Sequence, residues 1–209
     1  MVIELFSADT PNGKKISIML EEIGFDYKVT KVDLSKDEQF NPEFIKISPL
    51  SKIPVIIDHK NKEKIFESGA ILIYLAECSG KLYEQRYRNQ INQWLMVQMG
   101  YVGPMLGQHH QFHHFNPGKS KFAEDRYFKI SKNIYKALDT RLSESNYLAS
   151  DEYSIADIAT FPWIARHNWH DIGLEKFKNL ENWYTKISKR EAVIKGFKFM
   201  NEKDFPPLP

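Results

Sequence analysis

The chain has 209 residues, enough for one large domain or two small ones. Apolar residues make up 42% and charged residues 27% of the chain, a composition that excludes a disordered or fibrous protein. The 29 Lys and Arg nearly balance the 27 Asp and Glu, so the net charge of +2 indicates neither a nucleic-acid partner nor an anionic membrane. The single cysteine, Cys78, excludes an intramolecular disulfide and any multi-cysteine metal site.

Targeting and membrane signals are missing from the sequence. Residues 1–6 carry Glu4 inside their apolar run and no basic segment, unlike a secretory signal. The longest weakly polar stretch, Met99–Gly107, contains Gly and Pro and is far shorter than the roughly 20 residues that span a bilayer. We therefore expect a soluble, cytoplasmic protein without a membrane segment.

The first eighty residues alternate between strand and helix patterns. The strands are predicted over residues 2–6, 27–32, 53–57 and 65–66. The helices are predicted over residues 14–23 and 68–77, and the first of them ends at Gly24. This order predicts an α/β domain with one small sheet over residues 1–80.

From about Arg86 onward only helical patterns are found. Apolar residues recur at helical spacing in three segments, residues 91–102, 127–142 and 177–187. Ser154-Ile155-Ala156-Asp157 has the pattern of a capping box and predicts the start of another helix. The sequence therefore predicts a second, all-helical domain over residues 87–209, with a non-helical tail after Asp204.

The loop after the first strand is the first candidate for chemistry. In a thioredoxin-like sheet this loop carries a Cys-x-x-Cys pair, because the N-terminus of the following helix favours an anionic sulfur. Here the four positions read Thr10-Pro11-Asn12-Gly13 and contain no sulfur. An ordinary turn, for which Pro-Asn-Gly is typical, stays open as an interpretation of these residues alone.

Two further segments indicate a ligand site. Pro54 stands at the start of a predicted strand, where it is unfavourable unless it shapes a turn or follows a cis bond. A cis bond there would expose the N–H and C=O of Ile53 to an extended peptide ligand. In Phe66-Glu67-Ser68-Gly69, the start of a helix and the Ser68 hydroxyl could bind a carboxylate, while Glu67 could accept from an ammonium group. Ser68 equally suits an ordinary helix cap.

These segments, in this order over essentially the whole chain, resemble the cytosolic glutathione S-transferase family. The resemblance is strongest to its bacterial nu-class, Ure2-like branch. The motifs that carry it are Thr10–Gly13, Val32–Leu34, Glu38–Phe44, Ile47–Pro49, Lys52–Pro54, Phe66–Leu72, Gln93–Met96, Gly103–Gln108 and Tyr153–Ile158.

The resemblance implies a thioredoxin-like N-terminal domain, an all-helical C-terminal domain and a homodimer. It implies glutathione, reduced or oxidised, as a bound co-substrate, and no metal. By matching position, Thr10 and Asn12 would be catalytic and lie at the glutathione sulfur. The residues that would bind glutathione are Asn12, Gln39, Lys52, Ile53, Pro54, Glu67, Ser68 and Arg126.

The same resemblance implies a glutathione-dependent disulfide-bond reductase. Because the thioredoxin-like loop has no cysteine, the attacking sulfur would come from bound glutathione. Transfer of glutathione to a small electrophile, or a non-catalytic binding or regulatory role, stays open as an alternative. Val97 and Tyr101, where the branch commonly has Trp and Gly, leave the preferred second substrate open as well.

Two other features could compete with this site. His109-His110-Gln111-Phe112-His113-His114 has the i, i+4 spacing of a helical metal clamp, but it has no HExxH pattern and no evident third ligand. We expect these histidines to form a partly exposed surface that titrates. Cys78 falls at a predicted helix C-terminus, where the helix dipole raises the pKa of a thiol, so we expect it to have no catalytic role.

Overall fold

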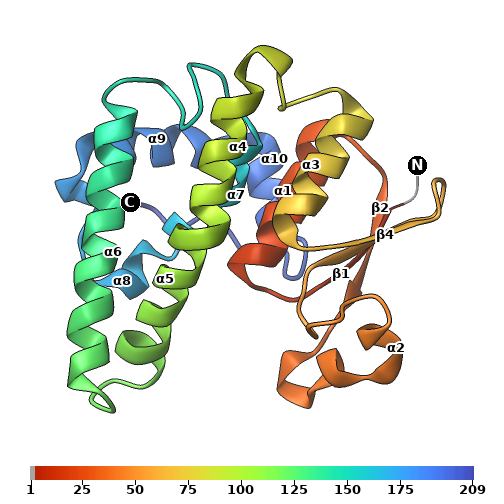
Figure 1. Cartoon of the computed structure of the whole chain (residues 1–209), viewed down its shortest axis with the longest axis horizontal. Coiled ribbons are helices and arrows are strands. Elements are labelled where there is room, and N and C mark those ends of the chain that lie inside the picture. The colour runs from red at the N-terminus through yellow and green to blue at the C-terminus, as the bar shows by residue number, and fades with distance from the viewer. Residues whose placement is uncertain (1–2) are drawn as a thin grey trace. The chain divides into compact units, whose positions relative to one another are not determined.

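The computed structural model describes residues 3–209, which divide into two compact units (Figure 1). The first unit comprises the described residues up to Lys81 together with Arg190–Pro206, and the second comprises Leu82–Lys189 and Pro207–Pro209. Val2, the first residue of the first predicted strand, lies outside the described residues.

The first unit is built on a four-stranded mixed sheet with the strand order β2-β1-β3-β4. β1 pairs in parallel with β2 and antiparallel with β3, and β3 pairs antiparallel with β4. In the central strand β1, alternate side chains are fully buried, because helices cover one face of the sheet. The strands are β1 Ile3–Ser7, β2 Tyr27–Lys31, β3 Val55–Asp58 and β4 Glu63–Phe66.

Two helices of the first unit, α3 and α10, pack against α1 (Figure 1). α1 ends as predicted at Gly24, whose φ of 73° is the left-handed conformation that glycine adopts readily. The connection from β2 to β3 contains 3₁₀ turns over Leu34–Lys36 and Glu38–Phe40. The helices are α1 Pro11–Ile23, α2 Pro42–Ile45, α3 Ser68–Ser79 and α10 Glu191–Phe197.

The segment Arg190–Pro206 groups with the first unit, although the sequence pattern placed it with the helical domain. Gly196 lies so close to α1 that a Cβ atom there would approach the Ile18 Cα to 2.7 Å. The Ser17 hydroxyl donates to the Gly196 carbonyl at 2.7 Å, and Arg190 binds both Glu22 carboxylate oxygens at 2.6 and 2.8 Å. These contacts join residues far apart in the chain, which local patterns do not reveal.

The second unit is all-helical, as predicted. Its helices are interrupted by π-helical turns over Gln98–Val102 and His110–Phe115. The predicted capping box is confirmed at the start of α7, where the Ser154 N–H donates to the Asp157 carboxylate at 3.0 Å. The helices are α4 Arg88–Val97, α5 Gly103–His109, α6 Lys121–Leu142, α7 Ile155–Ile164, α8 His167–His170 and α9 Lys178–Ser188. Among the helices of residues 3–209, none combines the length and apolar character needed to cross a bilayer.

Candidate functional site

The loop between β1 and α1 presents the first turn of α1. Thr10 is the N-cap of this helix, and its Oγ1 accepts from the Gly13 N–H at 3.1 Å. Pro11 occupies the first helical position, where its missing N–H has no consequence. Because Thr10 accepts at the cap, its hydroxyl proton can still be donated elsewhere. Gly13 has to be glycine, since a Cβ atom would lie 2.4 Å from the Ala8 carbonyl oxygen.

The turn before β3 presents the main chain of Ile53. The buried Ser48 hydroxyl holds this turn, because it donates to the Lys52 carbonyl at 2.7 Å and accepts from the Lys52 N–H at 3.0 Å. The Ile53–Pro54 peptide bond is cis, as the sequence suggested. Within residues 3–209, the N–H and C=O of Ile53 take part in no hydrogen bond, so both can pair with an extended ligand.

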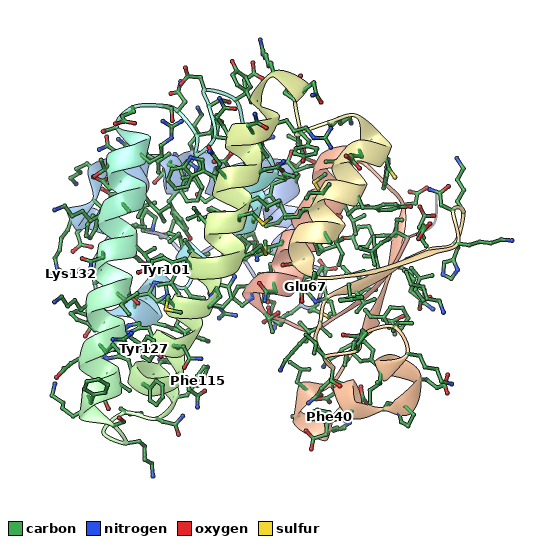
Figure 2. The ribbon with its side chains drawn as sticks, in the orientation of Figure 1. Phe40, Glu67, Tyr101, Phe115, Tyr127 and Lys132 are labelled. Atoms are coloured by element: carbon green, nitrogen blue, oxygen red, sulfur yellow. The ribbon has the colours of Figure 1, made fainter. Side chains whose placement is uncertain are left out.

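Glu67 and Ser68 join β4 to α3. The exposed Glu67 lies at the start of α3 (Figure 2), and its φ of 70° is unusual for a residue other than glycine. Backbone conformations of this kind concentrate at ligand sites, where the surrounding structure holds them. Ser68 is the first residue of α3 and is buried. The N-terminal end of this helix has the partial positive charge that favours a carboxylate.

These segments surround one pocket of the first unit, with a volume of about 150 Å³. The predicted binding residues that line it are Asn12, Lys52, Ile53, Pro54, Glu67 and Ser68. Ser48, Leu50 and Phe66 line it too, and no sequence pattern assigned these three residues to a site. The pocket thus combines unpaired main-chain groups, a helix N-terminus and a carboxylate, which suits a small zwitterionic peptide.

A buried lysine lies behind Ser68. Lys15, in α1, is only 1% exposed, and its Nζ donates to Ser68 Oγ at 3.2 Å. Burial lowers the pKa of Lys15 well below its usual value, and the Glu67 carboxylate opposes that shift. Sequence patterns missed Lys15, because a lysine in an amphipathic helix is normally assigned to the exposed face.

Three predicted site residues lie outside the lining of this pocket. Thr10 caps α1, as described above. Gln39 donates to Asp37 at 3.3 Å, and its shielded Oε1 has no hydrogen-bond partner within residues 3–209. Arg126 is exposed on α6, in the second unit. The structure therefore brings the other six predicted residues together around one pocket. The assignment of Thr10, Gln39 and Arg126 to the same site stays a prediction.

Two of the four clustered histidines are buried, although the sequence predicts a partly exposed surface. His109 and His110 are 0% and 6% exposed, so the prediction of a partly exposed, titrating surface is wrong for both. His170 links them to the core: its Nδ1 contacts the Tyr135 hydroxyl at 2.6 Å and its Nε2 contacts His110 Nε2 at 2.7 Å. His109 Nε2 contacts the His170 carbonyl at 2.9 Å. Burial lowers the pKa of His110 to about 3.

Neither Cys78 nor a metal-binding cluster forms a second candidate site in residues 3–209. Cys78 is a free, exposed cysteine in the last turn of α3, and it does not line the pocket. Among residues 3–209, no three His, Cys, Asp or Glu side chains are arranged to hold a metal ion.

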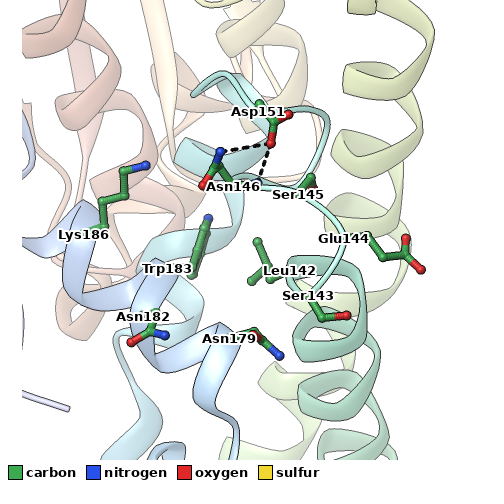
Figure 3. Close-up of a pocket in the computed structure, with 10 residues that line it drawn as sticks. All are labelled: Leu142, Ser143, Glu144, Ser145, Asn146, Asp151, Asn179, Asn182, Trp183 and Lys186. Carbon is green, nitrogen blue, oxygen red and sulfur yellow. Dashed lines mark hydrogen bonds between the residues drawn. The ribbon is translucent and has the colours of Figure 1, made fainter.

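A larger hollow of about 390 Å³ lies in the second unit, between the end of α6, the following loop and α9 (Figure 3). Its polar side chains largely serve the fold. Asp151 accepts from both the main-chain and side-chain nitrogens of Asn146, at 2.9 and 3.0 Å. The Asn179 N–H donates to Asp139 at 2.8 Å. Because these polar groups already form hydrogen bonds within the protein, they are not available to bind a ligand. The pocket of the first unit is therefore the stronger candidate site.

Comparison with known proteins relates the chain to one family over most of its length. Residues 1–77 match the N-terminal domain of glutathione S-transferases, and residues 99–191 match their C-terminal domain. The disulfide-bond oxidoreductase YfcG of Escherichia coli is 44% identical over 199 residues, which cover 92% of this chain and 93% of that protein. The disulfide-bond oxidoreductase YghU of the same organism is 32% identical over 213 residues, covering 93% of this chain and 73% of that protein.

Solved structures with bound glutathione share the fold. A glutathione transferase from Pseudomonas putida, with one glutathione disulfide per subunit, superposes with a TM-score of 0.89 at 44% identity, covering 95% of this chain and 92% of that one. A glutathione transferase from Burkholderia graminis, with two glutathione molecules per subunit, has a TM-score of 0.88 at 40% identity, covering 93% and 86%. With both domains matched and this identity over nearly its whole length, the chain belongs to the glutathione S-transferase family.

Proposed function

We propose that the protein is a glutathione-dependent disulfide-bond reductase whose nucleophile is the thiol of bound glutathione. One observation carries the proposal: the first turn of α1, where a thioredoxin-like fold holds its cysteine pair, has Thr10 and Asn12 instead and adjoins the pocket. Cys78 is exposed at the other end of a different helix. The two E. coli relatives, both named disulfide-bond oxidoreductases, support the same activity.

The pocket binds glutathione in an extended form in this proposal. The γ-glutamyl carboxylate meets Ser68 and the N-terminus of α3, and the γ-glutamyl ammonium meets Glu67. The cysteinyl main chain pairs with the unpaired N–H and C=O of Ile53, the residue just before the cis bond to Pro54. The exposed Lys52 adds a positive charge beside this main chain.

The remaining contacts serve the sulfur and the rim of the site. The Thr10 hydroxyl and Asn12 donate to the thiolate, and the N-terminus of α1 adds a favourable potential. The unpaired Gln39 Oε1 accepts from an N–H of the peptide, and Arg126, which is exposed on α6, keeps the glutathione-binding role that the family resemblance implies as a prediction.

The reaction consists of two thiol–disulfide exchanges. The glutathione thiolate attacks one sulfur of the substrate disulfide, so that a glutathione–substrate mixed disulfide forms and the other substrate sulfur leaves as a thiolate. A second glutathione thiolate attacks the glutathione sulfur of the mixed disulfide and releases the second substrate thiolate. The product is glutathione disulfide, and both electrons come from the two glutathione molecules. The glutathione transferases from P. putida and B. graminis, which hold one glutathione disulfide or two glutathione molecules per subunit, support a site with room for both peptides.

The same family membership supports a proposal for the assembly and the cellular location. The protein is a homodimer in this proposal, and it acts in the cytoplasm on a small-molecule disulfide. Size-exclusion chromatography with light scattering tests the dimer, because a monomeric mass at micromolar concentration would contradict it.

A paired assay tests the activity. The purified protein and glutathione are given a small disulfide in one arm and a chlorinated aromatic electrophile in the other. We expect turnover of the disulfide and little conjugation. Conjugation alone would replace the proposal with a transferase activity that uses the same thiolate, and no turnover of either substrate would indicate a binding or regulatory protein.

A further inference from the structure

A buried lysine near the start of α1 joins three separate parts of the first unit. Lys14 is only 5% exposed, and its Nζ contacts the carboxylate of Asp9, in the loop between β1 and α1. The same Nζ is 3.5 Å from the carbonyl oxygen of Phe197, the last residue of α10, and 3.5 Å from a carboxylate oxygen of Asp204. An ammonium group has three donors, so each of them has an acceptor here.

The helix alone does not favour a charge at this position. A cation in the first turns of a helix meets the positive end of the helix dipole, and a buried ammonium group loses its hydration. The carboxylates of Asp9 and Asp204 offset both costs, and a lysine commonly donates to the last carbonyls of a helix, as Lys14 does at the end of α10. The buried charge is therefore stabilised by the loop before α1 and by the chain after α10 together.

The chain after α10 contacts the first turn of α1 at a second point. The Cζ atom of the Phe199 ring would lie 3.3 Å from a Cβ atom on Gly13, and the ring centre is 5.7 Å from Lys14 Nζ. Asp204 is held in a turn, because its N–H donates to the Asn201 carbonyl at 2.9 Å and its carboxylate accepts from the Asn201 side chain at 3.1 Å. This part of the chain thus presents an ordered carboxylate and a ring to the start of α1.

The loop that Lys14 contacts carries Thr10, the N-cap of α1. Asp9 directly precedes Thr10, and the Thr10 N–H donates to the Ala8 carbonyl at 2.8 Å, so the chain turns sharply at Asp9. On the other side, the Lys14 N–H donates to the Thr10 carbonyl at 3.0 Å. Lys14 therefore binds this loop through its main chain and its side chain, on both sides of the capping residue. A displacement of Asp9 would move Thr10 and the first turn of α1 with it.

We propose that Lys14 and Asp204 are positioning residues, which hold the loop between β1 and α1 in the geometry that stabilises the glutathione thiolate. This inference rests on the proposed function, in which Thr10 and Asn12 donate to that thiolate. Lys14, Asp9 and Asp204 do not line the pocket, so they act on the sulfur through the loop and not by contact with the ligand. Small displacements of such groups are costly, because misplacement by about 1 Å can reduce a rate by about 100-fold.

The experiment compares disulfide turnover and the thiol titration of bound glutathione in the wild type, Lys14→Met and Asp204→Ala. In Lys14→Met we expect the thiol pKa to rise by about one unit, so that kcat at a pH below the thiol pKa falls about 3- to 10-fold. The loss of kcat should disappear above the thiol pKa, where the thiol is ionised in both proteins. KM for glutathione should stay within about 3-fold, because the pocket lining is unchanged. Asp204→Ala should change the same quantities in the same direction by a smaller amount.

Glu202→Ala is the matched control. Glu202 is exposed in the same part of the chain as Asp204, and its carboxylate forms no hydrogen bond or ion pair with any of residues 3–209. Its replacement removes a carboxylate without changing the contacts of Lys14. We expect kcat, its pH profile and the thiol pKa to match the wild type in this variant.

The outcomes separate this inference from the proposed function. An unchanged thiol pKa in Asp204→Ala, a loss of kcat that is equal at every pH, or an equal effect of Glu202→Ala would overturn the positioning role, while disulfide turnover by the wild type would still support the proposed function. Absence of disulfide turnover in the wild type would refute the proposed function and this inference with it. Thermal melting checks that each variant is folded at the assay temperature. Asp204→Ala changes a partly exposed side chain, so it decides the test if Lys14→Met does not fold.

Discussion

Acid should destabilise the second unit, because its buried histidines have to stay uncharged. The Nε2 atoms of His110 and His170 are 2.7 Å apart, so one ring must donate and the other accept. Two charged rings would turn two N–H groups toward each other in a site from which water is excluded. The neighbouring groups that also disfavour protonation of one ring or the other are His109, His113, His114, Arg166 and His167. The Asp171 carboxylate has the opposite effect on the adjacent His109.

The magnitude follows from the pKa values. Burial lowers the pKa of His110 from 6.5 to about 3 and lowers that of His170 well below 6.5. Because the folded-state pKa lies below the unfolded-state value, the unfolded chain binds protons first as the pH falls. The stabilisation is complete above pH 6.5 and decreases on acidification toward the folded-state pKa. At pH 5, 1.5 units below 6.5, the neutral His110 lowers the free energy of unfolding by about 2 kcal/mol, and the neutral His170 lowers it in the same direction.

Urea unfolding at pH 7.5 and pH 5, followed by tryptophan fluorescence, measures this loss. The signal reports on the second unit, which contains all four tryptophans, Trp94, Trp163, Trp169 and Trp183. His110→Asn should reduce the acid loss by about 2 kcal/mol, whereas His114→Asn, at an exposed position, should keep the wild-type loss. Equal stability of the wild type at the two pH values, or the same acid loss in both variants, would refute the reasoning.

Three further predictions test the site and the fold. Glu67→Ala should weaken glutathione binding by about 1–3 kcal/mol in calorimetry, because it leaves the ligand ammonium without its acceptor; unchanged affinity would show the site to be misplaced. Gly196→Ala should lower stability to urea by about 1–3 kcal/mol, because the new Cβ meets Ile18, while Gly100→Ala, with open space around it, should change stability little; equal effects would contradict the close packing. Asp157→Ala should lower stability by about 3–5 kcal/mol, because it leaves several buried N–H groups without an acceptor. A loss below about 1 kcal/mol would contradict this.

Local signals predicted the parts of the fold whose physics is local. The capping box at Ser154 and the end of α1 at Gly24 depend on residues within one or two helical turns, and both are confirmed. Pro54 at the start of a strand left few conformations open, and the structure has the cis form. The segments that line the pocket were found in the same way, because a helix N-terminus and a turn each have short sequence patterns.

Buried polar residues could not be predicted in this way. His110 is buried because His170 and Tyr135, far along the chain, supply its hydrogen-bonded surroundings. Lys15 is buried because Ser68 and Glu67 lie against its side of α1. In each case the residue type alone favours exposure, and only the tertiary partner reverses that preference.

The central claim is that the reactive sulfur belongs to glutathione, and the thiolate absorbance of the glutathione complex against pH tests it most directly. We predict that Cys78→Ser leaves the titration of the bound thiol unchanged. Asn12→Ala should raise the thiol pKa by roughly one to two units, because it removes a hydrogen bond worth about 1.5–3 kcal/mol to the thiolate. Thr10→Ala should raise it less if main-chain N–H groups supply most of the stabilisation. Loss of the thiolate signal in Cys78→Ser, together with an unchanged titration in Asn12→Ala, would contradict the account.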